Sequence, residues 1–265
     1  MDKITHKILK LFESFLGVSL QDKRKAWKAI GELIFAIFVA LAVRSLVMQP
    51  FKIPSESMYP TMLVGDYLWV SSWKYGYSRH SFPFSLPLVP GRVLFKEPPV
   101  GEIMVFRFPG DTSEYWIKRL IGRPGDKIQV KQGVLYINGG ACPQERLEDY
   151  TERTSLGYMQ AIPQFVETLP NGKKHKILRY SVEGLEMGDN TEEFTVPEDH
   201  YFMMGDNRNR SDDSRFQKLG YVHRDYFIGP MMFIMMSFDS SIWSLYKVWD
   251  LHHIIRFKRF FSSPE

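Results

Sequence analysis

Cysteine is almost absent from this chain of 265 residues, and the shortage excludes several kinds of site. The single Cys142 cannot form an intrachain disulfide, and its neighbours Gly139, Gly140 and Pro143 are typical of a turn rather than of the setting of a nucleophile. No zinc-finger spacing and no H-E-x-x-H zinc-protease signature occur in the sequence. We therefore expect neither a metal nor a cofactor.

Signatures of two other large classes are also missing. The net charge is only +4 and there is no basic region, so no nucleic-acid partner is expected. A G-x-S-x-G motif is absent, and none of the seven histidines lies in a recognisable catalytic signature, although His200 or His223 could approach a serine in space. The composition of 44% hydrophobic, 24% charged and 15% aromatic residues is typical of a globular chain with a β-rich core or a membrane-interface surface.

One long apolar run stands near the start of the chain. Residues 29–48 are mostly apolar and long enough to cross a bilayer, with Glu32 and Arg44 near the ends, where long side chains reach the interface. Residues 1–28 carry seven Lys/Arg against three Asp/Glu, which predicts that this end stays in the cytoplasm. We expect a single-pass anchor in contact with membrane lipid; the alternative is a buried core helix.

After the anchor the pattern changes to short β-type runs separated by turns. Gln132-Gly133 and Asn138-Gly139 predict hairpins, and the Pro-Gly-Asp runs at 109–111 and 124–126 predict further turns. The pattern favours a mainly β domain over a βαβ fold. The predicted strands are Tyr67–Ser72, Val93–Lys96, Glu102–Phe108, Tyr115–Ile121, Lys127–Val130, Val134–Ile137, Glu193–Met204 and Tyr226–Phe238.

The pattern divides the chain into six segments. One of them is more polar and less periodic than its flanks, so we interpret it as an insertion with some β structure inside one β domain. The tail mixes aromatic and basic residues and predicts a helix, which either lies on lipid or packs on the β domain. The segments are a basic cytoplasmic segment at 1–28, the anchor at 29–48, the first part of the β domain at 49–140, the insertion at 141–192, the second part at 193–238 and the amphipathic tail at 239–265.

A serine between two prolines follows the anchor. The segment reads Pro54-Ser55-Glu56-Ser57-Met58-Tyr59-Pro60-Thr61-Met62, and the prolines fix the backbone on either side of Ser57. A nucleophile needs such fixed placement. Taken alone, the pattern also fits an ordinary loop serine.

A lysine lies among apolar residues further along the chain. If residues 115–121 form a strand, Lys118 shares its face with Trp116 and Leu120, because side chains alternate. Desolvation disfavours the charged amine and lowers its pKa from about 10.4, so that it can act as a general base near pH 7. The alternative is an edge lysine that reaches past Trp116 into water.

A third segment, Gly205–Arg215, is dense in polar side chains. It fits either a flexible loop or a hydrogen-bond network that braces an active site. A calcium loop is not favoured, because the glycine at the sixth position and the terminal glutamate are missing.

These three segments, in this order and behind an N-terminal anchor, resemble the boxes of the type I signal peptidases, the bacterial leader peptidases with a Ser/Lys dyad. The P-S-x-S-M-x-P-T box of that family matches Pro54–Thr61. Its lysine box matches Trp116–Arg119 followed by Pro124–Asp126. Its last box, G-D-N-R-x-x-S-x-D-S-R, matches Gly205–Arg215.

The resemblance covers about residues 30–238, is weakest in 141–192, and departs from the common pattern at Asn209-Arg210. It implies coiled antiparallel β-sheets with a small β insertion. The implied activity is that of a membrane-bound serine endopeptidase that removes signal peptides from secretory preproteins, cutting after small residues. The implied location is the bacterial cytoplasmic membrane, with the β domain on the periplasmic side, while the oligomeric state stays open.

The family mechanism also implies roles for the matched residues. Ser57 is the expected nucleophile and Lys118 the expected general base. The Ser57 N–H and the Ser55 hydroxyl would hold the oxyanion, and Ser211 would orient the Lys118 amine. Asp213 and Arg215 would brace the active site from behind. Shallow pockets for the small residues before the cut would be shaped by Phe51, Ile53, Met58, Met62, Trp116 and Ile117.

Three other interpretations stay open. A specialised paralogue would keep the same residues with narrower substrates. A self-cleaving repressor-type protease shares the Ser/Lys dyad but carries a DNA-binding domain where this chain has an apolar run. A membrane-tethered β module without enzyme activity would need an ordinary, fully charged Lys118.

Overall fold

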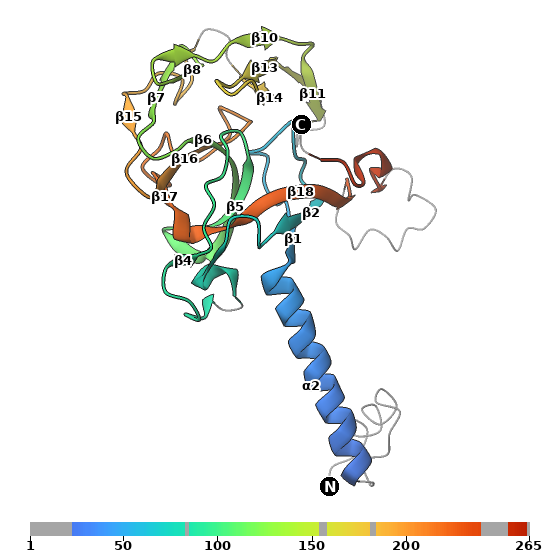
Figure 1. Cartoon of the computed structure of the whole chain (residues 1–265). Helices are drawn as coiled ribbons and strands as arrows, with labels where there is room; N and C mark the ends of the chain where they lie inside the picture. The colour runs from blue at the N-terminus through green and yellow to red at the C-terminus, as the bar shows by residue number, and fades with distance from the viewer. Residues whose placement is uncertain (1–22, 83–84, 154–157, 181–183, 240–253, 264–265) are drawn as a thin grey trace. The chain divides into compact units, whose positions relative to one another are not determined.

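The chain forms two compact units, Met1–Val47 and Met48–Glu265. The computed structural model describes residues 23–82, 85–153, 158–180, 184–239 and 254–263 (Figure 1). The basic segment predicted at 1–28 lies mostly outside the described residues. Each unit is therefore considered by itself.

The described part of the first unit is one long helix, α2 (Lys23–Leu46). Its segment Trp27–Leu46 is long and apolar enough to cross a membrane, and only 11% of it is buried by protein. A helix that is apolar on all sides and not covered by protein is typical of a membrane span. The helix begins six residues before the start of the anchor predicted at 29–48 and ends two residues before its end. The chain then continues as a strand.

A seven-stranded antiparallel sheet forms the centre of the second unit (Figure 1). Its strand order is β1-β2-β18-β5-β6-β16-β17. The last long strand, β18, therefore lies between β2 and β5, which come from the first half of the chain. The bounds of these strands are β1 (Met48–Lys52), β2 (Asp66–Ser71), β5 (Ile103–Phe108), β6 (Asp111–Gly122), β16 (His200–Met204), β17 (Val222–His223) and β18 (Phe227–Ser237).

Four smaller antiparallel sheets accompany this central sheet. Two of them belong to the insertion, which is therefore β structure as predicted. Their strands are β10 (Gln144–Arg146), β13 (Gln164–Thr168) and β14 (Lys174–Leu178) in one sheet, and β11 (Tyr150–Arg153) and β12 (Met159–Ile162) in the other. The remaining strands are β7 (Lys127–Lys131), β8 (Val134–Ile137), β9 (Gly140–Ala141) and β15 (Phe194–Thr195) in one sheet, and β3 (Tyr77–Ser78) and β4 (Arg92–Val93) in another.

The mainly β fold with antiparallel sheets confirms the predicted fold class. Both predicted hairpin turns are present, since Gln132-Gly133 and Asn138-Gly139 all have positive φ angles and join β7 to β8 and β8 to β9. The run predicted as one strand at 193–204 is two strands, because Asp199, just after Pro197, turns the chain with φ +59°. The short strand β1 was not predicted, because it directly follows the apolar helix.

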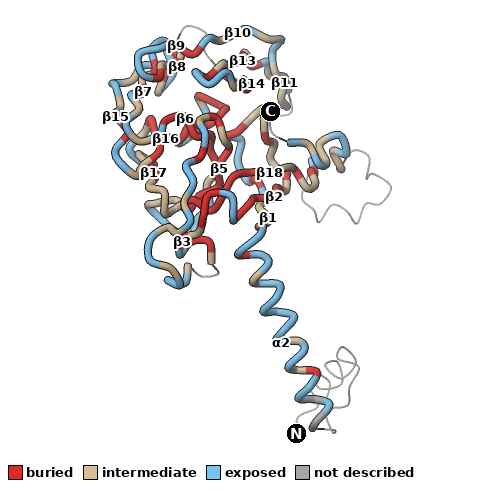
Figure 2. Tube along the Cα trace, viewed as in Figure 1, coloured by how far each residue is buried: buried red, intermediate tan, exposed pale blue. Residues whose placement is uncertain are grey.

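Buried residues gather on the central sheet and beneath the segment that follows β1 (Figure 2). Met58 and Met62 of that segment are fully buried in a cluster with Ile53 of the same segment and Ile117 of β6. Because both methionines are inserted in the core, the residues between and around them are held against the sheet. This packing fixes the serine segment relative to β6.

The described end of the tail runs along β18. The Phe261 N–H donates to the Ile234 carbonyl at 2.7 Å, and the Ile234 N–H donates to the Ser262 carbonyl at 2.9 Å. A single 3₁₀ turn covers Phe257–Arg259. Residues 240–253 of the predicted tail helix lie outside the described residues. Over 254–261 the prediction is wrong, because the chain there makes backbone hydrogen bonds to β18 in place of a continuous helix.

Candidate active site

Ser57 lies in a short turn between β1 and β2. The Tyr59 N–H donates to the Glu56 carbonyl at 3.0 Å, and the Met62 N–H donates to the Met58 carbonyl at 2.9 Å, so this segment is internally hydrogen-bonded. Ser57 is only 7% exposed. The two flanking prolines and the buried methionines together produce the fixed placement that the sequence predicts for Ser57.

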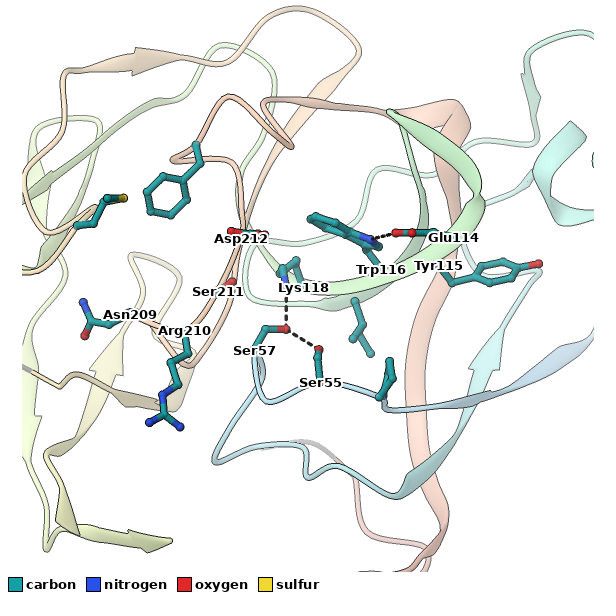
Figure 3. A pocket seen from close by; sticks show the side chains of 14 residues that line it. Ser55, Ser57, Glu114, Tyr115, Trp116, Lys118, Asn209, Arg210, Ser211 and Asp212 are labelled. Atoms are coloured by element: carbon teal, nitrogen blue, oxygen red, sulfur yellow. Dashed lines mark hydrogen bonds between the residues drawn. The ribbon is translucent and has the colours of Figure 1, made fainter. Parts of the chain in front are cut away.

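Lys118 projects from β6 toward the serine (Figure 3). Its Nζ donates to the Ser57 Oγ at 2.7 Å, and its side chain is 5% exposed. Leu120 is fully buried in one apolar cluster with Met104, the register partner of Lys118, and Trp116 packs on that cluster. The lysine therefore lies on an apolar face, as the alternation of side chains predicts, and the edge-lysine alternative is wrong.

This environment lowers the pKa of Lys118 to about 8. Burial is the main cause, because it removes water from the charged amine. The carboxylates of Asp213 and Asp212 act in the opposite direction, and the Arg215 guanidinium adds to the lowering. About a tenth of the amine is neutral at pH 7 and about half at pH 8.

The two other serines predicted for the site also lie here (Figure 3). The Ser55 Oγ is 3.4 Å from the Ser57 Oγ, and Ser55 is exposed to the cleft. Ser211 is 5% exposed and lines the same cleft as Lys118. Within the described part of the chain its hydroxyl makes no hydrogen bond, so it is not bonded to the Lys118 amine in this structure.

Asp213 and Arg215 form a buried pair behind these residues. The Arg215 Nε and Nη2 each donate to the Asp213 carboxylate at 2.9 Å, which is a bidentate arrangement. Asp213 also accepts the Gly205 N–H at 3.1 Å. Burial alone would raise the pKa of Asp213, but the guanidinium outweighs it and the pKa is lowered. The pair therefore stays ionised and holds the two ends of the polar segment together.

An open cleft of about 770 Å³ runs over the Ser57–Lys118 pair. Trp116 lies at one side of it, where its indole N–H donates to Glu114 at 3.0 Å (Figure 3). Its ring stacks on that of Phe108, with ring centroids 4.3 Å apart. The cleft is lined by Pro54, Ser55, Ser57, Glu114, Tyr115, Trp116, Ile117, Lys118, Met187, Asn209, Arg210, Ser211, Asp212 and Phe216.

Of the residues predicted to contact substrate, two line this cleft and the others do not. Trp116 and Ile117 line it. Phe51 packs edge-on against the lining residue Tyr115, with ring centroids 4.9 Å apart. Ile53, Met58 and Met62 lie in the core that contains Ile117 and are buried. Their predicted contact with substrate stays a prediction.

Sequence reasoning missed the residues on the side of the cleft opposite Trp116. Asn209 and Arg210 lie there, across the Ser57–Lys118 pair (Figure 3). The Arg210 Nη1 donates to Glu56 at 3.1 Å and to Glu152 of β11 at 2.8 Å, which connects the serine segment to the insertion. The departure from the family pattern at Asn209-Arg210 was a local signal that could have pointed to these two residues as part of the cleft. Nothing in the sequence pointed to Met187.

The arrangement has the chemistry of an acyl-transfer site. A hydroxyl is hydrogen-bonded to an amine that loses its proton near neutral pH, and a second hydroxyl lies beside it. Among the described residues, no group of three or more His, Cys, Asp or Glu side chains could hold a metal ion.

Comparison with known proteins gives consistent similarities. A crystal structure of a signal peptidase I from Enterococcus faecalis V583 is 29% identical and covers 51% of this chain and 97% of that one, with a TM-score of 0.30. The signal peptidase I of Rickettsia typhi is 42% identical over 233 residues, which are 84% of this chain and 86% of the relative.

The signal peptidase I of Rickettsia conorii is 41% identical over 219 residues, which are 80% of each chain. The family profile described as signal peptidase, peptidase S26, matches residues 26–236. The chain therefore belongs to the signal peptidase family, peptidase S26.

Proposed function

We propose that this protein is a membrane-bound endopeptidase that removes N-terminal signal peptides from exported preproteins. Its curated relatives named signal peptidase I cover four fifths or more of the chain. The observation that carries the proposed mechanism is the 2.7 Å contact between the Lys118 amine and the Ser57 hydroxyl in a buried setting. The lowered pKa of Lys118 supports a base that is available near neutral pH.

The proposed reaction has two halves. The Ser57 Oγ attacks the scissile carbonyl while the Lys118 amine takes its proton, and the protonated lysine then gives that proton to the leaving amine. The acyl group remains on Ser57 until a water molecule attacks the ester while Lys118 takes one of its protons. The signal peptide then leaves with a free carboxylate, and the proton on Lys118 passes to the Ser57 Oγ, which restores the hydroxyl. The Ser57 N–H and the Ser55 hydroxyl would bind the oxyanion in both halves.

The cleft supports a preference for small residues before the cut. Trp116 and Ile117 give an apolar wall beside the nucleophile, and Ile117 also packs in the core with Met58 and Met62. The proposed orientation places the β unit on the periplasmic side, because the basic residues precede the apolar helix.

The test is cleavage of a purified preprotein with an A-x-A site, in detergent. Wild type is expected to cut after the last small residue, and Ser57→Ala and Lys118→Met are expected to lose cleavage while staying folded. Matched controls are Ser113→Ala and Lys131→Met, which change exposed residues outside the cleft and should keep wild-type rates. Full activity of Lys118→Met would overturn the proposed dyad.

A further inference from the structure

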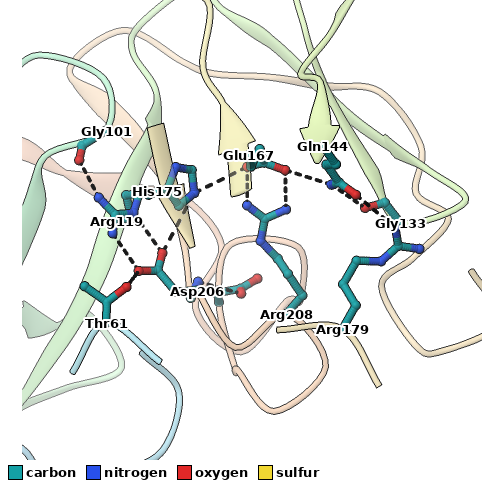
Figure 4. A network of polar contacts seen from close by, with 12 residues as sticks. Thr61, Gly101, Arg119, Gly133, Gln144, Glu167, His175, Arg179, Asp206 and Arg208 are labelled. Atoms are coloured by element: carbon teal, nitrogen blue, oxygen red, sulfur yellow. Dashed lines mark hydrogen bonds and ion pairs between the residues drawn. The ribbon is translucent and has the colours of Figure 1, made fainter. Parts of the chain in front are cut away.

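The insertion contributes a buried carboxylate to the support of the active site. Glu167 of β13 is fully buried, and its carboxylate binds both Nη atoms of Arg208, one of them at 2.9 Å (Figure 4). Gln144 of β10 donates to the same carboxylate at 2.9 Å. A buried charge is costly unless it is paired and hydrogen-bonded, and here the partners come from the insertion and from the loop after β16.

The same loop has a second buried ion pair two residues earlier. Arg119, next to Lys118 on β6, donates to Asp206 with Nε at 2.8 Å and with Nη2 at 2.6 Å (Figure 4). Asp206 is also hydrogen-bonded by the Thr61 hydroxyl. The side chains of Asp206 and Arg208 therefore have their bidentate partners in different parts of the fold, Arg119 in the central sheet and Glu167 in the insertion.

Asn207, the residue between these two pairs, contacts the nucleophile segment. Its backbone N–H donates to the Ser57 carbonyl at 3.1 Å, and its Nδ2 donates to the Glu56 carbonyl at 3.1 Å. Asn207 is completely buried. Asn207 therefore binds the backbone of Ser57 directly, and the residues on either side of it, Asp206 and Arg208, are each held by a buried ion pair.

The contacts that hold residues 206–208 are called the clamp below. Main-chain hydrogen bonds connect this clamp to the insertion as well. The Leu178 N–H at the end of β14 donates to the Asp206 carbonyl at 2.9 Å, and the Arg208 N–H donates to the Leu178 carbonyl at 3.0 Å. Leu178 and Asn207 form a parallel bridge. The insertion therefore holds the loop by its backbone as well as by the Glu167 side chain.

We propose that Asn207 and Glu167 are positioning residues for Ser57, and that the insertion is thereby a working part of the active site. The inference rests on the proposed Ser57–Lys118 reaction. Ser57 and Lys118 come from separate elements, so their 2.7 Å contact depends on where the serine segment is held. A displacement of about 1 Å can cost about 100-fold in rate.

The Glu167 carboxylate is not among the main charges that act on the lysine, whereas Asp206 of the loop after β16 is one of them. The groups that shift the pKa of Lys118 are led by burial and Asp213, and Glu167 is not among them. Loss of Glu167 or of the Asn207 side chain, with Asp206 kept, should therefore lower kcat without moving the pH at which Lys118 becomes a base. A general loss of folding would not produce this combination.

The experiment measures kcat, KM, the pH profile and Tm of the full-length protein in detergent on the A-x-A preprotein. Asn207→Ala and Glu167→Gln are expected to lower kcat about 10- to 100-fold, with KM within about twofold and an unchanged midpoint of the pH profile. Glu145→Gln and Asn171→Ala, exposed residues of the insertion, serve as matched controls with unchanged kcat.

A double variant separates positioning from stability. In Glu167→Met with Arg208→Met, the buried pair is replaced by apolar side chains of similar length, which need not lower stability. A wild-type Tm with a kcat still lowered about tenfold or more supports the proposal. A wild-type Tm with wild-type kcat overturns it, and so does an Asn207→Ala variant with unchanged kcat.

Failure of the wild type to cleave would count against the proposed function instead. The inference would then be decided by crystal structures of the Asn207→Ala and Glu167→Gln variants. A Ser57 Oγ displaced from the Lys118 Nζ supports it. An unchanged 2.7 Å contact in both variants overturns it.

Discussion

Burial of Lys118 has opposite consequences for activity and for stability. It makes the amine a base near neutral pH, and it makes the charged form costly in the folded protein. Its pKa of about 8 predicts that activity rises with pH, because the reaction needs the neutral amine. We expect kcat/KM to increase about tenfold per pH unit below 8 and to level off above it. Measurement of the profile between pH 6 and 10 checks this, and a flat profile through pH 8 would contradict it.

The same residue should limit the stability of the fold. The folded protein releases the Lys118 proton near pH 8 and the unfolded chain near 10.5, so between these values the unfolded state binds more protons and stability rises with pH. Below pH 8 the buried charge therefore lowers the free energy of unfolding. We expect Lys118→Met to raise this free energy by about 1–3 kcal/mol at pH 7.

The advantage of that variant should shrink as the pH increases from 8 toward 10. Urea unfolding at several pH values measures it, with exposed Lys131→Met as the control that shows no pH-dependent difference. A loss of stability in Lys118→Met at pH 7 would show that the amine is well solvated or paired in the folded protein.

At the scale of elements, the described tail segment is fastened by one buried carboxylate. Asp66 of β2 is fully buried, and Arg259 donates to it with Nε at 3.1 Å and with Nη2 at 2.6 Å. Removal of the guanidinium leaves the carboxylate with the Leu63 N–H at 2.8 Å, with the Ser237 hydroxyl, and with Arg256, whose nearest nitrogen is 3.8 Å away. We expect Arg259→Ala to lower the free energy of unfolding by about 2 kcal/mol.

The neighbouring Lys258 provides the control for that prediction. It lines a groove but makes no ion pair within the described part of the chain. Lys258→Ala should change stability by less than about 0.5 kcal/mol. Equal effects of the two substitutions in urea unfolding would mean that the tail is not held through Asp66.

Local signals explain which elements the sequence could predict. Hairpins such as β7–β8 have their turn dipeptides and alternating side chains within a few residues, so the strands and the turn between them could be predicted. The Ser57–Lys118 pair was predicted through the resemblance to the family boxes, because the flanking prolines and the apolar neighbours of the lysine left other interpretations open. Glu167 carries no such signal, because its partner Arg208 is 41 residues away and only the folded insertion brings them together.

At the scale of the whole molecule, the order of basic segment, apolar helix and β unit predicts how the chain crosses the membrane. Lys25 at the start of α2 should face the cytoplasm, and Lys131 of β7 should face the periplasm. The single native cysteine does not interfere with thiol labelling. Cys142 is buried, and burial raises the pKa of its thiol to about 12, so it reacts slowly with maleimides.

Lys25→Cys and Lys131→Cys therefore test the orientation directly in cells whose outer membrane has been made permeable. A maleimide that cannot cross the cytoplasmic membrane is expected to label Lys131→Cys while that membrane is intact, and Lys25→Cys only after lysis. The wild type should stay unlabelled and serves as the control. Labelling of Lys25→Cys in intact cells would reverse the orientation. It would also place Ser57 on the cytoplasmic side, where the N-terminal parts of preproteins are present before export, so the proposed substrate would meet the enzyme too early.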